Sequence, residues 1–286
     1  MLATEDLTVV DGAAAGAWIE PGLAGEIGSV GAHVPRVFEA YARVFHPACD
    51  GDGRSVSWAQ VAEALGRIAH REMQWHALVG TADCDGLDGS SWEGGVPLVG
   101  EMDDEMLAPL CAALAASTAD PDHCFFGICT IMGWVEDACS REERRLPQLR
   151  LPLKRDHVVL AGPLSAVDQI ADRSTGGRGS TVAVFAGDSS AEEIERARAE
   201  AEDWIASVGW RHPPQLIWPA DRSWLVVTEV DFDSTLVGGS AELIAAVVDS
   251  PGLEAWAVDP GVSLACGADE LNPVEGLDSA EWQGEA

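Results

Sequence analysis

Three carboxylate side chains, Glu229, Asp231 and Asp233, follow one another at every second position. Because side chains alternate across a β-strand, this spacing predicts that all three share one face, each within roughly 7 Å of the next. Their mutual repulsion must then be relieved by water, by a cation or by Arg and Lys partners. The group is therefore the main candidate for a functional site.

Two kinds of positive partner suit these carboxylates. Hard oxygen ligands bind Mg²⁺ or Mn²⁺, and a metal-bound water would be the nucleophile of a hydrolase. Alternatively, Arg222 or the basic segment 141–155 pairs with them. We expect the arginine arrangement, because no histidine or further acid lies near in sequence to complete a metal shell, and surface ion pairs are common. No cofactor is predicted.

The carboxylates are predicted to lie on a strand over residues 224–232, a segment rich in Val, Thr and aromatic residues between two polar loops. Alternation assigns one face to the core and gives the other face Leu225 and Val227 before the acids. The residues of the core face are Trp224, Val226, Thr228, Val230 and Phe232.

Ser240 is predicted to cap a helix that follows STLVGG and carries apolar residues at helical spacing. Free amides at such a helix start can bind an anion, although a tight turn from strand to helix is the commoner arrangement. A small-ligand pocket lined by Trp218, Trp224 and Trp256 is a further alternative, although buried tryptophans more often belong to the core. The candidate binding residues are Trp218, Asp221, Arg222, Trp224, Glu229, Asp231, Asp233 and Ser240.

The composition describes a globular, strongly acidic chain. Its 286 residues are 47% hydrophobic, and 48 acidic against 17 basic side chains give a net charge of −31. We therefore expect neither nucleic acid nor an anionic membrane as a direct partner, since contacts with phosphates draw their affinity from basic residues. A basic protein is the partner that this charge favours.

Targeting signals and cysteine spacing predict a cytoplasmic protein. The amino terminus has acidic residues where a signal peptide needs basic ones, and no apolar run is long enough to span a membrane. Seven cysteines, an odd number without dense spacing, suit buried thiols in a reducing compartment better than a disulfide framework.

The remaining periodicities predict an α+β fold with a largely antiparallel or mixed sheet and packed helices. Helices are expected to begin near Ser57, near Asp103 and near Ser190, the last over residues 190–208. We predict a globular unit over residues 1–258, and a connector at 141–155 if that unit divides into two halves. Residues 259–286 carry many acids and few large apolar side chains, which predicts an acidic disordered tail.

The chain resembles a family of uncharacterised actinobacterial cytosolic proteins. The likeness is carried by WPADRSWLVVTEVDFDSTLVGGS over 218–240, with FEAYARVFHPA upstream, HVVLAGPL in the middle and LIAAVVDSPGLEAWAV after it. It covers residues 16–258, within which 173–208 has the character of an addition. The resemblance implies a common fold and transfers no catalytic residue.

Three functions are compatible with these patterns. The sequence favours a non-catalytic acidic binding or interaction protein, because no motif pairs a nucleophile with a base and the net charge suits a basic partner. A divalent-metal-dependent hydrolase using Glu229, Asp231 and Asp233 is the first alternative. A small-ligand-binding protein is the second.

Overall fold

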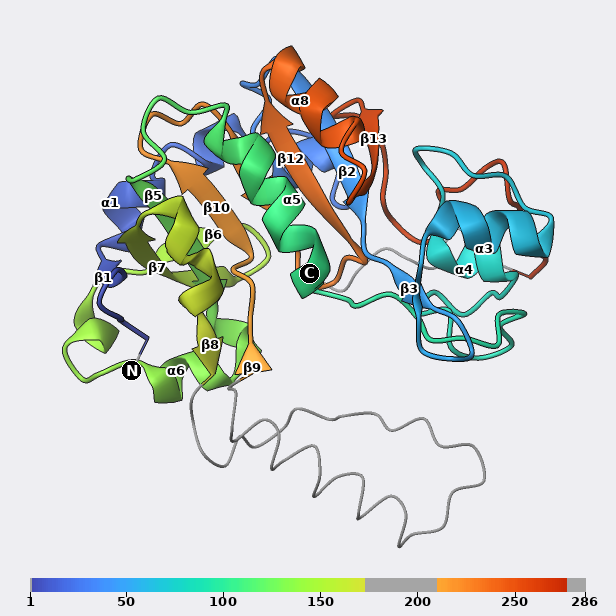
Figure 1. Cartoon of the computed structure of the whole chain (residues 1–286), viewed down its shortest axis with the longest axis horizontal. Coiled ribbons are helices and arrows are strands. Elements are labelled where there is room, and N and C mark those ends of the chain that lie inside the picture. Colours follow the sequence, from blue (N-terminus) through green and yellow to red (C-terminus); the bar gives the residue numbers. More distant parts are fainter. Residues whose placement is uncertain (1, 173–209, 277–286) are drawn as a thin grey trace, which may run out of the picture.

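One antiparallel sheet of nine strands runs through the molecule, of which a computed structural model describes residues 2–172 and 210–276 (Figure 1). The strands follow in the order β1-β7-β5-β10-β11-β12-β2-β13, and β6 pairs with β7. Their bounds are β1 Thr8–Val10, β2 Ala40–Phe45, β5 Cys124–Cys129, β6 Leu149–Leu151, β7 Arg155–Gly162, β10 Leu216–Pro219, β11 Leu225–Val227, β12 Ser234–Gly239 and β13 Glu254–Val258. The predicted α+β class is confirmed.

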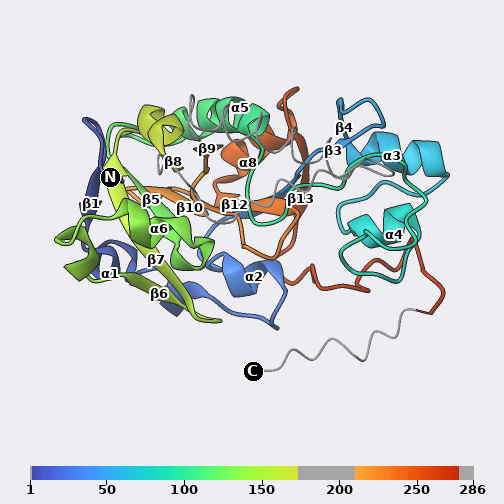
Figure 2. The ribbon, with the colours of Figure 1, turned by 90° about the horizontal axis from the view of Figure 1, so that it is seen from below.

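Helices cover both faces of this sheet. Figure 2 shows α5 (Asp104–Ala115) and α8 (Ala241–Val248) on one face, and α1 (Gly12–Gly16) and α2 (Val30–His33) on the other. The central strands are therefore buried on both sides, which explains their continuous apolar sequences. The shorter elements include α6 Trp134–Ala138, η1 Glu20–Gly22, η2 Thr130–Met132, η3 Glu143–Arg145, η4 Leu164–Gln169, β8 Ala171–Asp172 and β9 Trp210–Arg211.

Strand β11 shows how the two cores divide. Trp224 and Val226 belong to the apolar cluster beneath α5 and α8, as the alternation predicted. Leu225 and Val227 belong to a second cluster on the opposite face, together with residues of the amino-terminal segment. Both faces of the strand are core, so neither is available as a solvated surface.

The strand is shorter than the predicted 224–232. It ends at Val227, and a turn closed by the Phe232 amide on the Glu229 carbonyl at 2.9 Å leads back into β12. Val230 is therefore a turn residue and not a core strand residue. The segment STLVGG, which was expected to be the connection to the helix, is itself the buried central strand β12.

The glycines at the end of β12 are explained by packing. A Cβ atom at Gly238 would lie 2.5 Å from the Phe38 ring, and one at Gly239 would lie 2.6 Å from the Leu243 side chain. Side chains from both faces of the sheet thus approach this backbone closely. The strand then passes directly into α8, which Ser240 caps by accepting a hydrogen bond from the Leu243 amide at 3.2 Å.

A smaller lobe lies beyond the β13 end of the sheet, as Figures 1 and 2 both show. It contains α3 (Trp58–Leu65), α4 (Trp75–Val79) and the short pair β3 (Ala48–Cys49) and β4 (Ser55–Val56). The predicted start of α3 is confirmed, because Ser57 and Gln60 form a capping box. This lobe has its own apolar cluster, centred on Trp58, Trp75 and Met73.

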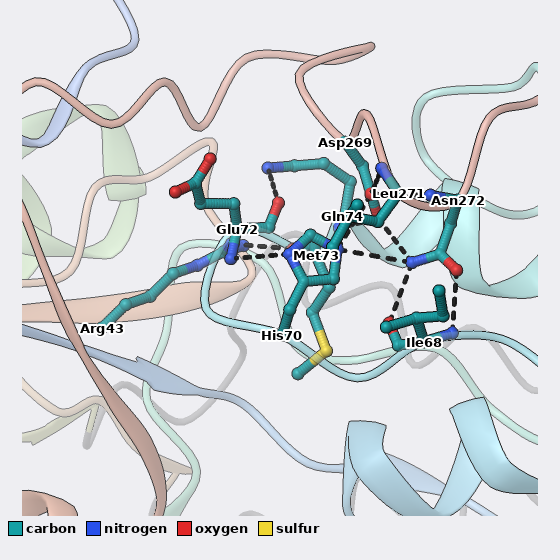
Figure 3. A network of polar contacts seen from close by, with 9 residues as sticks. All are labelled: Arg43, Ile68, His70, Glu72, Met73, Gln74, Asp269, Leu271 and Asn272. Atoms are coloured by element: carbon teal, nitrogen blue, oxygen red, sulfur yellow. Dashed lines mark hydrogen bonds and ion pairs between the residues drawn. The ribbon is translucent and has the colours of Figure 1, made fainter.

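The described part of the predicted disordered tail is held in two places: residues 260–264 bond to residues 28–31, and residues 266–272 pack against the smaller lobe. Asn272, which is 2% exposed, accepts a hydrogen bond from the Ile68 amide and donates to the Ile68 carbonyl, both at 2.9 Å (Figure 3). Asp269 accepts from the Gln74 amide and lies 2.9 Å from the His70 ring nitrogen. Charged and amide side chains hold this segment, a device that a count of apolar residues does not detect.

A disulfide joins the same segment to the lobe. It links Cys84 to Cys266 across 182 residues of sequence. The prediction of thiols without a disulfide framework is corrected for this pair, whereas Cys49, Cys111, Cys124 and Cys129 are free thiols. Linear spacing could not identify the pair, because the fold alone brings these two positions together.

Two further predictions concern segments outside the sheet. The helix expected near Asp103 is α5, whose first turn is capped by the Asp103 carboxylate accepting from the Glu105 amide. The helix expected over 190–208 lies outside the described residues. Among the helices of residues 2–172 and 210–276, none has the length and apolarity needed to cross a membrane.

Candidate functional site

The fold separates the three carboxylates that the sequence places on one strand face. They follow the end of β11, within and after the turn, and their surroundings differ. The Glu229 side chain is 10% exposed, whereas that of Asp231 is 67% exposed. The prediction that the three carboxylates share one strand face is therefore wrong.

Arg155, the last residue of the basic segment 141–155, pairs with two of the carboxylates. Its Nε donates to Glu229 Oε1 at 2.7 Å, and its Nη2 donates to Asp231 Oδ2 at 2.5 Å. The arginine partner expected from the basic segment is thus present. Arg222, the other expected partner, lies elsewhere. It adopts a positive φ of 58°, and its guanidinium lies 5.7 Å from the centre of the Trp18 ring.

Asp233 has a separate arginine that the sequence did not reveal. The buried side chain of Arg43 donates from Nη2 to Asp233 Oδ1 at 3.3 Å, from Nε to Ser234 and from Nη1 to the Met73 carbonyl. Its guanidinium also lies over the ring of Phe45. Arg43 therefore connects the sheet to the smaller lobe, and Asp233 balances its charge.

The other candidate binding residues serve the structure in separate places. Trp218 stacks on Phe125, and the Trp224 Nε1 donates to the Leu114 carbonyl at 3.1 Å. Trp218, Trp224 and Trp256 pack with three different clusters, so they do not line one pocket. Asp221 accepts from Thr118 and from the Ala119 amide, which ties two loops together.

The helix start at Ser240 has an anionic partner supplied by the protein. The Glu39 carboxylate accepts a hydrogen bond from the Ala241 amide at 3.2 Å. A carboxylate at this end suits the helix dipole. The segment is accordingly a tight strand-to-helix connection with its own anion.

A cavity of about 160 Å³ lies beside the Arg155–Glu229 pair, on the face of the sheet that α2 covers. Its wall is mostly apolar, with Leu216 and Val227 from the sheet and Leu151 and Leu153 from the β6–β7 hairpin. A few polar side chains converge on it. They are His33, Cys129, Arg155, His157, Gln215, Thr228 and Glu229.

Two histidines of the cavity wall are held neutral. Burial lowers the pKa of His33 to about 4, and the charge of Arg155 acts in the same direction. Burial likewise lowers the pKa of His157 to about 4, against the effect of its hydrogen bond to the Arg155 carbonyl. Burial raises the pKa of Glu229, which the hydrogen bond from Arg155 opposes. At neutral pH the cavity therefore has two uncharged imidazoles beside a paired carboxylate.

The rim of the cavity is apolar and contains a strained turn. Ile27 and Leu153 line the cavity, and they are 72% and 47% exposed. Leu153 and Lys154 have φ values of 62° and 59°, which residues with side chains rarely adopt. Strained backbone of this kind gathers at binding sites, where the surrounding structure over-determines it.

Sequence reasoning did not identify His33 or His157 as site residues. His33 ends the short helix α2, and His157 lies in an apolar strand, so each resembles an ordinary core or edge residue in the sequence. Glu229 was identified, although with a different role. The sequence signal for His157 is its place at the start of an apolar run, and that pattern is too common to indicate a site.

A metal centre at the carboxylates gains no support from the geometry. No group of three or more His, Cys, Asp or Glu side chains arranged to hold a metal occurs within the described ranges.

No family model matches the chain, and neither a curated protein nor a solved structure is significantly similar to it. We therefore infer the function from the geometry of the cavity.

The buried histidines predict a loss of stability in acid. The pKa of His157 is about 4 in the folded protein and about 6.5 in an unfolded chain. Below pH 6.5 His157 binds a proton in the unfolded chain but not in the folded protein. The free energy of unfolding therefore falls as the pH drops from 6.5 towards 4. His157 should account for roughly 2 to 3 kcal/mol of this loss by pH 4.5.

His157→Asn tests this expectation, because an Asn amide can keep the donor to the Arg155 carbonyl without titrating. Urea unfolding at pH 7 and pH 4.5 should give a smaller difference for this variant than for the parent. His123→Asn, at an exposed position, is the matched control and should keep the parental difference. An equal acid loss in parent and His157→Asn protein would show that His157 is accessible to protons in the folded state.

Proposed function

We propose that the protein binds a small molecule in the cavity between α2, the β6–β7 hairpin and the end of β11. The observation that carries this proposal is the combination of an apolar wall with a few converging polar groups, among them imidazoles with strongly lowered pKa values. Such a combination is typical of ligand sites and is costly to maintain without one.

The size of the cavity limits the ligand. A cavity of about 160 Å³ is close to the engineered apolar cavity of about 150 Å³ that binds benzene. The proposed ligand is therefore a compact molecule with about one ring. The exposed side chains of Ile27 and Leu153 at the rim would contact it as it enters.

Filling the cavity provides the test. Ala32 lines it, and Ala32→Phe should occupy much of its volume. A screen of one-ring fragments by ligand-observed NMR should find binders of the parent protein that no longer bind this variant. For a ligand at about 100 times its Kd, the parent should gain about 2.7 kcal/mol of stability.

Ala245→Phe, on the exposed surface of α8, is the matched control and should bind the fragments as the parent does. Equal binding by parent and Ala32→Phe protein would place the fragments elsewhere. No binder in the screen would contradict the proposed function.

A second function, binding of a basic protein partner, is favoured by the net charge of −31. Arg43 and Arg155 are already counted in this total, and each pairs with a carboxylate of the protein. An acidic surface attracts a basic partner and would repel nucleic acid. Association with polylysine that weakens as salt rises would support this function, and no association at low salt would contradict it.

The cytoplasmic location also stays a prediction. The Cys84–Cys266 disulfide is of a kind that persists in oxidising compartments, which opposes it. Fractionation of cells that produce the protein would decide the matter, since recovery outside the cytoplasm would contradict the prediction.

A further inference from the structure

We propose that the ligand of this cavity is an uncharged one-ring compound with a hydroxyl group, which donates a hydrogen bond to His157 Nε2. This inference rests on the proposed function and adds the chemical class of the ligand. It follows from an unpartnered acceptor in the cavity wall and from the balance of charges around that acceptor.

Strand β7 places His157 on the face of the sheet that borders the cavity. Its register partner on β5 is Cys129, and the side chains of directly opposite residues project from the same face of a sheet. Arg155, two residues earlier on β7, shares this face. All three side chains line the cavity, so two adjacent strands build this polar part of the wall.

The hydrogen bonding of His157 determines which ring nitrogen is free. Its Nδ1 lies 3.1 Å from the Arg155 carbonyl, and a carbonyl can only accept, so the hydrogen of the neutral ring is on Nδ1. Nε2 then carries a lone pair. Because Nδ1 turns back to the main chain of its own strand, Nε2 faces away from the strand, toward the cavity that the residue lines.

This lone pair is buried without a donor. His157 is only 4% exposed, and its Nε2 has no hydrogen-bond partner among residues 2–172 and 210–276. A buried acceptor that lacks a donor costs free energy, because it has lost its hydrogen bonds to water. A ligand that brings the donor into the cavity would recover that free energy on binding.

The charges of the wall favour an uncharged ligand. Arg155 and Glu229 pair with each other at 2.7 Å, and both histidines are neutral, so the ionised groups of the wall balance. Burial also raises the pKa of the Cys129 thiol, which keeps it protonated. A cation would meet Arg155 and the same loss of solvation that keeps the histidines neutral, whereas an anion would meet Glu229.

A hydroxyl group suits this wall because it both donates and accepts. Its hydrogen would go to His157 Nε2. Its oxygen can accept from Arg155, whose guanidinium has N–H groups beyond the two that Glu229 and Asp231 accept. An ether or a ketone has no hydrogen for the imidazole, and a hydrocarbon leaves it unpaired.

Phenol, toluene and anisole test the inference, because they share one ring and differ in the polar group. Phenol is uncharged at pH 7 and donates, anisole only accepts, and toluene does neither. Titrations followed by protein NMR should show phenol binding about tenfold more tightly than the other two, as expected for one hydrogen bond to an otherwise unpaired acceptor. Benzylamine and benzoate, which are charged at this pH, should bind more weakly than phenol.

The outcomes separate this inference from the proposed function. Equal binding of phenol, toluene and anisole that is lost in Ala32→Phe protein would overturn the hydroxyl assignment and leave the small-ligand function intact. Tighter binding of benzylamine or benzoate than of phenol would have the same meaning. If none of these compounds binds the parent protein, both the inference and the proposed function are contradicted.

The imidazole itself gives a readout that needs no variant. An accepted hydrogen bond moves the ¹⁵N resonance of an unprotonated imidazole nitrogen upfield, so phenol should shift the Nε2 resonance of His157 in this direction. Toluene controls for the ring current of a bound aromatic molecule and should cause a smaller shift. Equal shifts with both compounds would show that phenol does not donate to His157.

His157→Phe removes the acceptor and keeps a ring on the strand. It should weaken phenol binding about tenfold and leave toluene binding unchanged. His123→Phe, at an exposed position, is the matched control and should keep the parental preference for phenol. A preference that survives in folded His157→Phe protein would contradict the assignment to this imidazole.

Discussion

Val226→Asp is expected to leave the chain without a cooperative thermal transition. Val226 is fully buried at the centre of the sheet, between β10 and β12, and packs in the cluster beneath α5 and α8. The change removes about 1.5 to 3 kcal/mol of apolar burial and places an unpaired carboxylate in the core, at a further cost of several kcal/mol. The total approaches the stability of roughly 5 to 15 kcal/mol of a typical domain.

Val230→Asp is the matched control for this experiment. Val230 lies three residues after the end of β11, in the partly exposed turn. Its replacement should cost about 1 kcal/mol, mostly through repulsion from the neighbouring acids, and the protein should stay folded. Circular dichroism during heating distinguishes the variants. Similar cooperative melting of both would contradict the assignment of Val226 to the core.

Arg155→Ala should destabilise the protein by about 3 to 5 kcal/mol. The Arg155 and Glu229 side chains are only 14% and 10% exposed, so removal of the arginine leaves a buried carboxylate without its partner. Asp231 adds repulsion but is exposed enough for water to screen it. Urea unfolding at pH 7 measures the loss.

A second substitution separates the buried charge from the packing of the arginine. Arg155→Ala combined with Glu229→Gln should recover much of the loss, because a neutral amide costs less to bury than a carboxylate. Arg222→Ala is the control arginine, and its contact with the Trp18 ring should contribute no more than about 1 kcal/mol. A loss of similar size in Arg222→Ala and Arg155→Ala would show that Arg222 also supports the carboxylates.

The Arg155–Glu229 ion pair is part of the cavity wall and is also the subject of the stability prediction. Glu229 is held by Arg155, and both residues line the cavity. A ligand bound in this cavity would stabilise the folded protein by mass action.

The sequence by itself determined the class of the fold and several of its elements. Capping residues at Ser57, Asp103 and Ser240 predicted the starts of helices, because these side chains satisfy amides within a few residues of themselves. Alternation correctly assigned Trp224 and Val226 to the core. Such signals are local, so they can be recognised without knowing the fold.

The tertiary structure alone decided which distant groups meet. The partners of Glu229 and Asp233 are Arg155 and Arg43, and the cavity is completed by His33 and His157 from different elements. Sheet pairing, not sequence distance, sets these contacts. The end of β11 at Val227 was also not predictable, because both β11 and β12 are buried on two faces and their apolar runs lack the alternation that marks a solvated strand.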